Sequence, residues 1–270
     1  DMARMKIEVQ HHYNTKHGLP LKDTLISNLP RYAHIASQWP RLMNLRNQWP
    51  WLARLAESFT GLSAERSWPE WKKEHFFNSQ RKGVSAKEVL AASKPVVLFV
   101  DTFNGYFESE NAWAAFDVLS AAGYQVHIAS RTQQDAPGQH LCCGRTYLAS
   151  GQVSKAKEHA QALLEALLPF AQKGIAIVGL EPSCLLTLRD ESLVMGLGEM
   201  AETVAAHAVL FEEFLAAENK AGKLDSLKAK LAPAQKPILL HGHCHQKAFG
   251  LMPSVTQVIE LIPEAKVELI

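Results

Sequence analysis

The sequence predicts an α/β protein: a parallel sheet flanked by helices, built from a duplicated unit and preceded by an N-terminal helical extension. Short apolar runs, typical of strands covered on both faces, alternate with amphipathic helical patterns after residue 90. Residues 95–128 and 237–270 repeat the order strand, polar loop, helix, strand, and Pro95 and Pro237 lie 142 residues apart. Self-similarity of this kind indicates a duplicated supersecondary unit.

Residues 1–85 form the predicted helical extension. Most of the tryptophans of the chain lie here, namely Trp39, Trp49, Trp51, Trp68 and Trp71, and three of them precede a proline. Proline favours the first turn of a helix and disfavours helix at the residue before it, so we predict short helices joined by sharp turns. We expect the helices to pack through the tryptophans. The alternative is that the tryptophans form a docking surface for other parts of a longer chain.

Residues 90–270 form the predicted α/β domain, with the second repeat cut short at the C-terminus. Strands are expected at 95–100, 124–128, 175–180 and 237–240, and residues 267–270 alternate like a further strand. A loop is expected at 101–105, and helices at 111–122, from Ser154 onward and at 199–220. Gly123 and Gly174 stand where glycines end helices.

Composition excludes several classes of function. The formal net charge is only +1, which provides no field to attract nucleic acid. No apolar run approaches the ~20 residues that a transmembrane helix needs, and no signal-peptide pattern opens the chain. We therefore expect a cytoplasmic protein, peripheral to the inner face of the membrane only through a larger complex. Cysteines are reduced in that compartment, which favours metal ligation or redox chemistry over structural disulfides.

The cysteines are the most informative residues of the chain. Cys142 and Cys143 are adjacent and precede Gly144, while Cys184 and Cys244 each follow a short apolar run. We expect all four at strand ends or helix starts on one edge of a sheet, where α/β proteins bind their ligands. Sulfur ligands select zinc or iron–sulfur, and the spacing matches no zinc finger built from paired CxxC motifs. Four unrelated buried cysteines are the alternative.

Six further residues are candidates for supporting roles or ligation. Asp101, at the end of a strand, would accept a hydrogen bond or ligate. Arg145 would neutralise an anionic cluster or bind a carboxylate. The remaining candidates are Glu181, His241, His243 and His245. The histidines alternate, and they would bind metal, transfer protons or form hydrogen bonds around the cysteine site. No catalytic residue is expected.

Three motifs together resemble a known family. They are the Cys-Cys-Gly at 142–144, the stretch 178–191 with its Glu-Pro-Ser-Cys turn, and the stretch 240–248 with its His-Gly-His-Cys-His turn. They resemble the cysteine-rich CCG domains of heterodisulfide reductase subunits and of glycolate and glycerol-3-phosphate oxidoreductases. The closer resemblance is to the C-terminal region of large FAD- and iron–sulfur-containing D-2-hydroxy-acid dehydrogenases, of the D-lactate, D-2-hydroxyglutarate or glycolate oxidase type. Asp1 and Met2 resemble the end of a ferredoxin-type motif.

The resemblance implies that Cys142, Cys143, Cys184 and Cys244 hold an iron–sulfur cluster of the 4Fe–4S type. It also implies FAD on another domain of a longer chain, a ferredoxin-like part, and an electron acceptor that is a quinone or a carrier protein. The chain alone would then be inactive. One departure is that Asp101 and Thr102 stand where the family carries a cysteine, so the first repeat is one ligand short.

Cys244, or a second cysteine pair beyond the chain at roughly position 284, would supply the missing ligand. We therefore expect the chain to be isolated without an intact cluster. Two alternatives from other classes remain. One is a docking or assembly domain whose cysteines hold zinc or nothing. The other is a thiol-based redox enzyme that uses Cys143 at a helix N-terminus.

Overall fold

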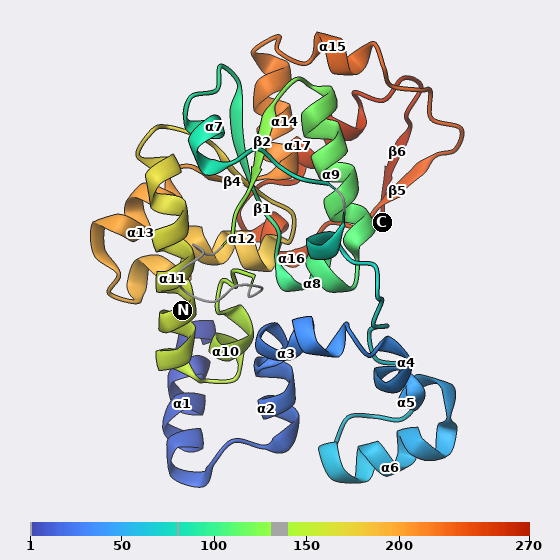
Figure 1. Ribbon diagram of the computed structural model, residues 1–270, viewed down its shortest axis with the longest axis vertical. Helices are drawn as coiled ribbons and strands as arrows, with labels where there is room; N and C mark the ends of the chain where they lie inside the picture. The colour runs from blue at the N-terminus through green and yellow to red at the C-terminus, as the bar shows by residue number, and fades with distance from the viewer. Residues whose placement is uncertain (1, 80, 131–139) are drawn as a thin grey trace. The chain divides into compact units, whose positions relative to one another are not determined.

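The computed structural model describes residues 2–79, 81–130 and 140–270, and it divides into two compact units (Figure 1). Unit 1 comprises residues 1–81, Asp101–Glu110 and Ser130–Ala166. Unit 2 comprises Lys82–Val100, Asn111–Ala129 and Leu167–Ile270. Two segments that the sequence placed with the α/β domain, 101–110 and 130–166, therefore cluster with the N-terminal helices.

Unit 1 is built from helices, and its described residues contain no strand, which confirms the helical extension. Its elements are α1 (Met2–His17), α2 (Leu21–Ser27), α3 (Leu29–Ala36), α4 (Pro40–Met43), α5 (Leu45–Gln48), α6 (Pro50–Thr60), the 3₁₀ helix η1 (Phe76–Asn78), α8 (Thr102–Tyr106), α10 (Arg145–Ala149) and most of α11 (Val153–Ala171). Pro40 and Pro50 begin α4 and α6, as expected for a residue that has no N–H to satisfy.

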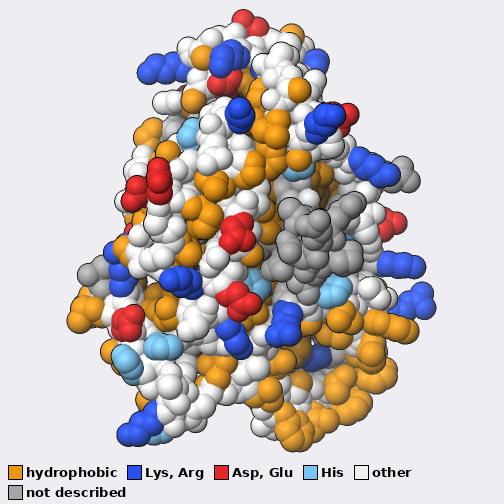
Figure 2. All heavy atoms as spheres, turned by 60° about the vertical axis from the view of Figure 1, so that its left-hand side comes forward, with side chains coloured by type: hydrophobic (Ala, Val, Ile, Leu, Met, Phe, Trp, Pro, Cys, Tyr) orange, Lys and Arg blue, Asp and Glu red, His pale blue; other side chains and the backbone are white. Residues whose placement is uncertain are grey.

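The core of unit 1 contains only one of the N-terminal tryptophans. Trp71 packs edge-on against Phe107 at a ring-centroid distance of 4.7 Å, in a cluster with Tyr106. Trp39, Trp49 and Trp51 are 63%, 47% and 61% exposed, so the prediction that the tryptophans pack the extension is wrong for these three. Ala53 is the buried residue of α6, whereas the larger apolar side chains of Trp51, Leu55 and Phe59 are exposed. Figure 2 shows exposed hydrophobic side chains gathered in one area of the surface, and Trp39, Trp49 and Trp51 are among the exposed hydrophobic residues.

Unit 2 contains a four-stranded parallel sheet, which confirms the predicted fold class. The strands are β1 (Pro95–Phe99), β2 (Gln125–Ile128), β3 (Ile177–Gly179) and β4 (Ala208–Leu210), in the order β2-β1-β3-β4. The flanking helices are α7 (Ala86–Leu90), α9 (Ser109–Ala121), α12 (Pro182–Arg189), η2 (Glu191–Val194), α13 (Gly198–Ala205), α14 (Phe211–Lys220) and α15 (Asp225–Lys228). Val96, Val97 and Leu98 in the central strand β1 are completely buried, as the continuous apolar run predicts.

The C-terminal region forms a separate two-stranded sheet. β5 (Ile238–Leu240) and β6 (Val267–Leu269) pair in parallel, with α16 (Cys244–Ala248) and α17 (Met252–Ile259) between them. The order of elements matches that of β1, α8, α9 and β2, whereas the duplication itself stays a prediction. The expectation that the cysteines follow strands of one sheet is wrong, because β5 belongs to a different sheet from β3.

Two predicted elements differ from the structure. Residues 101–105 were expected to be a loop, but α8 begins at Thr102 because the Asp101 side chain caps it. The predicted helix at 199–220 is split by β4, which pairs with β3 in the core. Burial of an apolar strand beside β3 outweighs the helical propensity of this segment. The helix expected from Ser154 begins one residue earlier, at Val153.

Candidate metal centre

The four cysteines form two groups, one in each unit, and none of them forms a disulfide. Cys142 and Cys143 lie in unit 1, and Cys184 and Cys244 lie in unit 2. All four lie within three residues of the first residue of a helix, as the sequence predicted. Their convergence into a single site stays a prediction, so each group is described by itself.

In unit 1 the backbone at the start of α10 directs its N–H groups to the two adjacent sulfurs. The Gly144 amide donates to Cys142 Sγ and the Arg145 amide donates to Cys143 Sγ, each at 3.4 Å. Gly144 has φ +83°, and a Cβ there would lie 2.5 Å from the carbonyl oxygen of Ala156. Only glycine permits both the left-handed backbone and this close approach to α11. The Cys-Cys-Gly sequence is thus a requirement of this turn.

Cys142 is poorly disposed to ionise alone. Its pKa is raised well above the ordinary value by the hydrogen bond with Cys143, by burial and by the charge of Cys143, while the Gly144 N–H and the Thr102 hydroxyl act in the opposite direction. The two sulfurs therefore lie close together in a buried place. A thiolate pair of this kind is costly unless a cation replaces the protons, which is how thiolate ligands bind metals.

Asp101 caps a helix at the end of β1. It is 2% exposed, and its carboxylate accepts from the Phe103 amide at 2.8 Å, the Asn104 amide at 3.1 Å and the Asn104 side-chain amide at 2.7 Å. Both oxygens thus have donors. This geometry supports the hydrogen-bonding role proposed for Asp101 and accounts for its burial without a metal.

The sequence reasoning did not foresee a hydrogen-bonded group formed by His140, Thr102 and Tyr106, and His140 lines the same cavity as Cys142. The Thr102 hydroxyl lies 3.0 Å from His140 Nε2, and the Tyr106 hydroxyl lies 3.2 Å from His140 Nδ1. The His140 ring also stacks on Phe77, with centroids 5.0 Å apart. His140 lies two residues before Cys142, and that proximity was the signal available in the sequence. The contacts of Thr102 and Tyr106 with His140 could not be foreseen, because residues 101–105 were predicted to be a loop and form part of α8 instead.

In unit 2 the N-termini of α12 and α16 contact each other. Glu181 caps α12 by accepting from the Ser183 amide at 3.1 Å, and Pro182 and Cys184 follow in the first turn. His243 caps α16, where its Nδ1 accepts from the His245 amide at 3.2 Å. The contacts between the helices include two polar ones: His243 Nε2 lies 3.9 Å from Glu181 Oε1, and His245 Nδ1 lies 3.2 Å from Ser183 Oγ.

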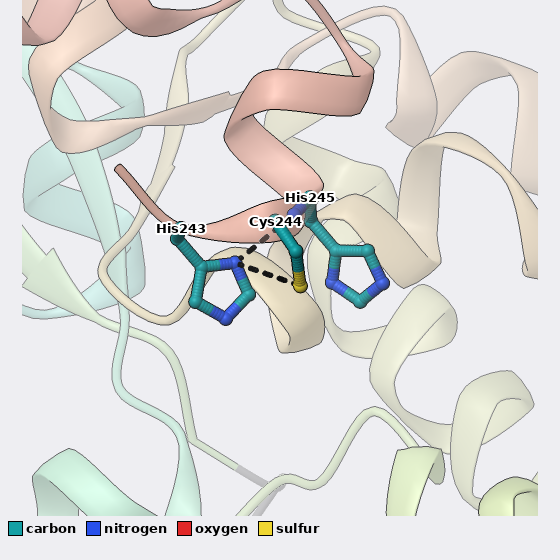
Figure 3. Close-up of side chains that lie close together, drawn as sticks. All are labelled: His243, Cys244 and His245. Atoms are coloured by element: carbon teal, nitrogen blue, oxygen red, sulfur yellow. Dashed lines mark hydrogen bonds between the residues drawn. The ribbon is translucent and has the colours of Figure 1, made fainter. Parts of the chain in front are cut away.

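His243, Cys244 and His245 form a group that could hold a metal ion. Their ligand atoms all lie within 4.8 Å of one another, and the two imidazole rings flank the sulfur (Figure 3). Cys244 is exposed, whereas the other three cysteines are buried. The histidines would divide between the two faces of a strand only if the strand continued through them, and it does not, because β5 ends at Leu240 and α16 begins at Cys244. The structure does not bring His241 into this group.

The chemistry of the donors fits either iron–sulfur or zinc. No protein-family model, curated protein or solved structure matches this chain. An iron–sulfur cluster needs about four thiolates, and each unit presents two. Backbone N–H groups directed at sulfur, as at Cys142 and Cys143, stabilise thiolate charge. Zinc accepts mixed cysteine and histidine ligands, which the group at 243–245 presents.

Proposed function

We propose that the chain is an electron-transfer domain in which Cys142, Cys143, Cys184 and Cys244 hold an iron–sulfur cluster. The observation that carries this proposal is the pair of adjacent, buried sulfurs, each of which accepts a backbone N–H from the start of α10. A buried thiol pair with mutually unfavourable ionisation is stabilised when metal displaces the protons. The cluster would supply one-electron transfer.

The residues of this chain would hold and tune such a group. The N–H groups of Gly144 and Arg145 would reduce the negative charge on the ligand sulfurs, which raises a reduction potential. The Thr102 hydroxyl would donate to the Cys142 sulfur. Burial of Cys143 would exclude water from its sulfur. Arg145 would complement the negative charge of a thiolate-bound cluster.

The proposed context is an FAD-dependent dehydrogenase of D-2-hydroxy acids. The motifs at 178–191 and 240–248 support it through their resemblance to such enzymes. FAD would be bound elsewhere, hydroxy-acid oxidation would take place there, and electrons would pass through ferredoxin-like centres and this domain to a quinone or a carrier protein. We propose a cytoplasmic location for the assembly. None of the helices in the described ranges 2–79, 81–130 and 140–270 is long and apolar enough to span a bilayer.

Anaerobic reconstitution with iron and sulfide tests the proposal. We expect visible absorbance and matched iron and sulfide content, both lost in Cys143→Ser. Thr102→Cys would place a third sulfur beside Cys142 and should raise the cluster yield. Ser150→Cys is the control and should not raise it, because the Ser150 hydroxyl of the unmodified chain bonds to the Tyr147 carbonyl. Equal iron and sulfide in the parent chain and in Cys143→Ser would refute the role of the pair.

A zinc-binding docking domain is the second candidate function. Glu181 behind His243 and Ser183 behind His245 resemble the hydrogen-bonded partners that orient metal-binding histidines. His243 Nδ1 now accepts the capping N–H, and that bond is worth about 1 kcal/mol, whereas structural zinc sites gain roughly 10 kcal/mol. Metal binding would therefore displace the cap.

Zinc titration with competition against a chromophoric chelator separates the two functions. We expect stoichiometric zinc in the unmodified chain, loss of zinc in Cys244→Ser, and no change in His241→Asn, which lies outside the group. If Cys244→Ser binds zinc like the unmodified chain, the docking candidate fails. The raised pKa of Cys142 makes Cys142 a poor nucleophile, so a thiol-based redox enzyme would have to use Cys143, whose sulfur accepts the Arg145 amide at the start of α10.

A further inference from the structure

A cavity of about 230 Å³ opens within unit 1 beside the Cys142 thiol. Its walls come from α3, α10 and α11, and they include Arg31, Tyr147, Lys155 and Glu158. One water occupies about 30 Å³ of liquid, so the cavity has room for a ligand of roughly four to seven heavy atoms. It is too small for a nucleotide or a flavin, which need several hundred Å³.

The charges of the cavity favour an anion. Arg31 and Lys155 are cationic and Glu158 is anionic, which leaves one net positive charge from the lining side chains before any histidine is protonated. Two of these charged side chains also shift the pKa of the Tyr147 hydroxyl. Burial is the main cause of the raised pKa of Tyr147; the charges of Cys142 and Glu158 raise it further, and Arg31 lowers it. Arg31 and Glu158 therefore both act at the Tyr147 hydroxyl.

Arg31 is the cation that is available to hold a ligand. The Lys155 amine is already bonded to Gln152 Oε1 at 3.0 Å and lies 5.8 Å from the centre of the Tyr147 ring. Across the described part of the chain, no carboxylate forms an ion pair with the exposed Arg31 side chain. A guanidinium presents parallel N–H donors that match the two oxygens of a carboxylate.

The cavity lining also includes aromatic surface. The rings of Tyr147 and His159 stack with centroids 4.7 Å apart, and the Tyr147 hydroxyl is fixed by its bond to Asn28 Oδ1 at 3.2 Å. The Cys142 thiol lines the same cavity. A short carbon chain held at Arg31 would thus contact a rigid aromatic pair and a sulfur rather than water.

We propose that this cavity is a binding site for a small monocarboxylate, with the carboxylate on Arg31 and the carbon chain against Tyr147, His159 and Cys142. One net positive charge matches a monoanion better than phosphate, which is largely dianionic at neutral pH. The site goes beyond the proposed electron-transfer function, since it requires no cluster. A bound acid would cover Cys142 and reduce its access to solvent.

Calorimetric titration of the full chain with propionate, at low ionic strength, tests the proposal. Surface electrostatics are strongest under this condition. We expect saturable binding at one site, weakened about tenfold or more in Arg31→Gln, because a charge-assisted bidentate bond is lost. Glu158→Gln should instead tighten binding severalfold by removing a like charge. Arg54→Gln, on the exposed surface of α6, should bind like the unmodified chain.

The opposite signs separate ligand binding from a structural effect, since misfolding would weaken binding in both variants. The proposal is overturned if Arg31→Gln binds propionate as tightly as the unmodified chain, if Glu158→Gln binds more weakly, or if no saturation is reached at tens of millimolar propionate. Inorganic phosphate is the second probe. Tighter binding of phosphate than of propionate would show a site for dianions and would overturn the monocarboxylate assignment.

Discussion

Replacing Asp101 with alanine tests whether this buried carboxylate stabilises the fold or is kept for ligation. The donors that reach it include two backbone amides in the first turn of α8 and the side-chain amide of Asn104. Loss of a helix cap costs about 1 kcal/mol, and each buried donor left without an acceptor adds roughly 1–3 kcal/mol. Because some donors will find water, we expect Asp101→Ala to lower the free energy of unfolding by about 2–4 kcal/mol.

Urea denaturation followed by circular dichroism measures this loss. Asp101→Asn keeps an acceptor oxygen and should cost less than half as much, since asparagine caps helices about as well as aspartate. Ser85→Ala removes a cap on the exposed start of α7 and should cost about 0.5–1 kcal/mol. If Asp101→Ala costs no more than Ser85→Ala, the buried cap does not stabilise the protein and the reasoning fails.

Three further predictions follow from particular contacts. Gly144→Ala should cost at least about 1 kcal/mol more than Gly123→Ala in urea denaturation, because both glycines have positive φ but only Gly144 meets another backbone closely. Burial raises the pKa of Glu212, so the folded state resists ionisation of this carboxyl and the stability of the protein falls as pH rises through that pKa. Glu212→Gln should therefore be more stable than the unmodified chain at pH 7. The difference should vanish in acid, where Glu212 is protonated in both the folded and the unfolded state. Arg189 and Glu213 form an ion pair at 2.7 Å, and their side chains are 26% and 16% exposed. A double-mutant cycle between them should give a coupling free energy of about 1 kcal/mol, and a coupling near zero would contradict this prediction.

The strands of unit 2 were largely predictable, with one exception. β1, β2, β3 and β5 follow continuous or alternating apolar runs, and such runs form strands wherever both faces are buried. β4 was not predictable, because Ala208–Leu210 is short and lies in a segment rich in helix-forming residues. Its conformation depends on pairing with β3, and the local sequence carries no signal for that partner.

The candidate centre was predictable in composition but not in arrangement. Adjacent cysteines before a glycine indicate a tight turn at a helix start, and the structure has that turn at Gly144. The capping roles of Asp101, Glu181 and His243 were not foreseen, because a cap is recognised only when the helix start is placed correctly. Roles for Arg145 and Glu181 beside a metal stay predictions.

The strand-to-helix turns after β1 and β5 are alike, but the first helical residue is a threonine in one turn and a cysteine in the other. Asp101 and His243 lie 142 residues apart and both cap a five-residue helix, so Thr102 and Cys244 occupy the same first helical position. The Thr102 hydroxyl lowers the pKa of Cys142, whereas Cys244 lies between two imidazoles. A neutral hydroxyl is a poor ligand for iron or zinc but a good donor to a thiolate. In the proposed site, Thr102 would therefore act on Cys142 in unit 1, whereas Cys244 belongs to the group in unit 2 that could hold a metal ion.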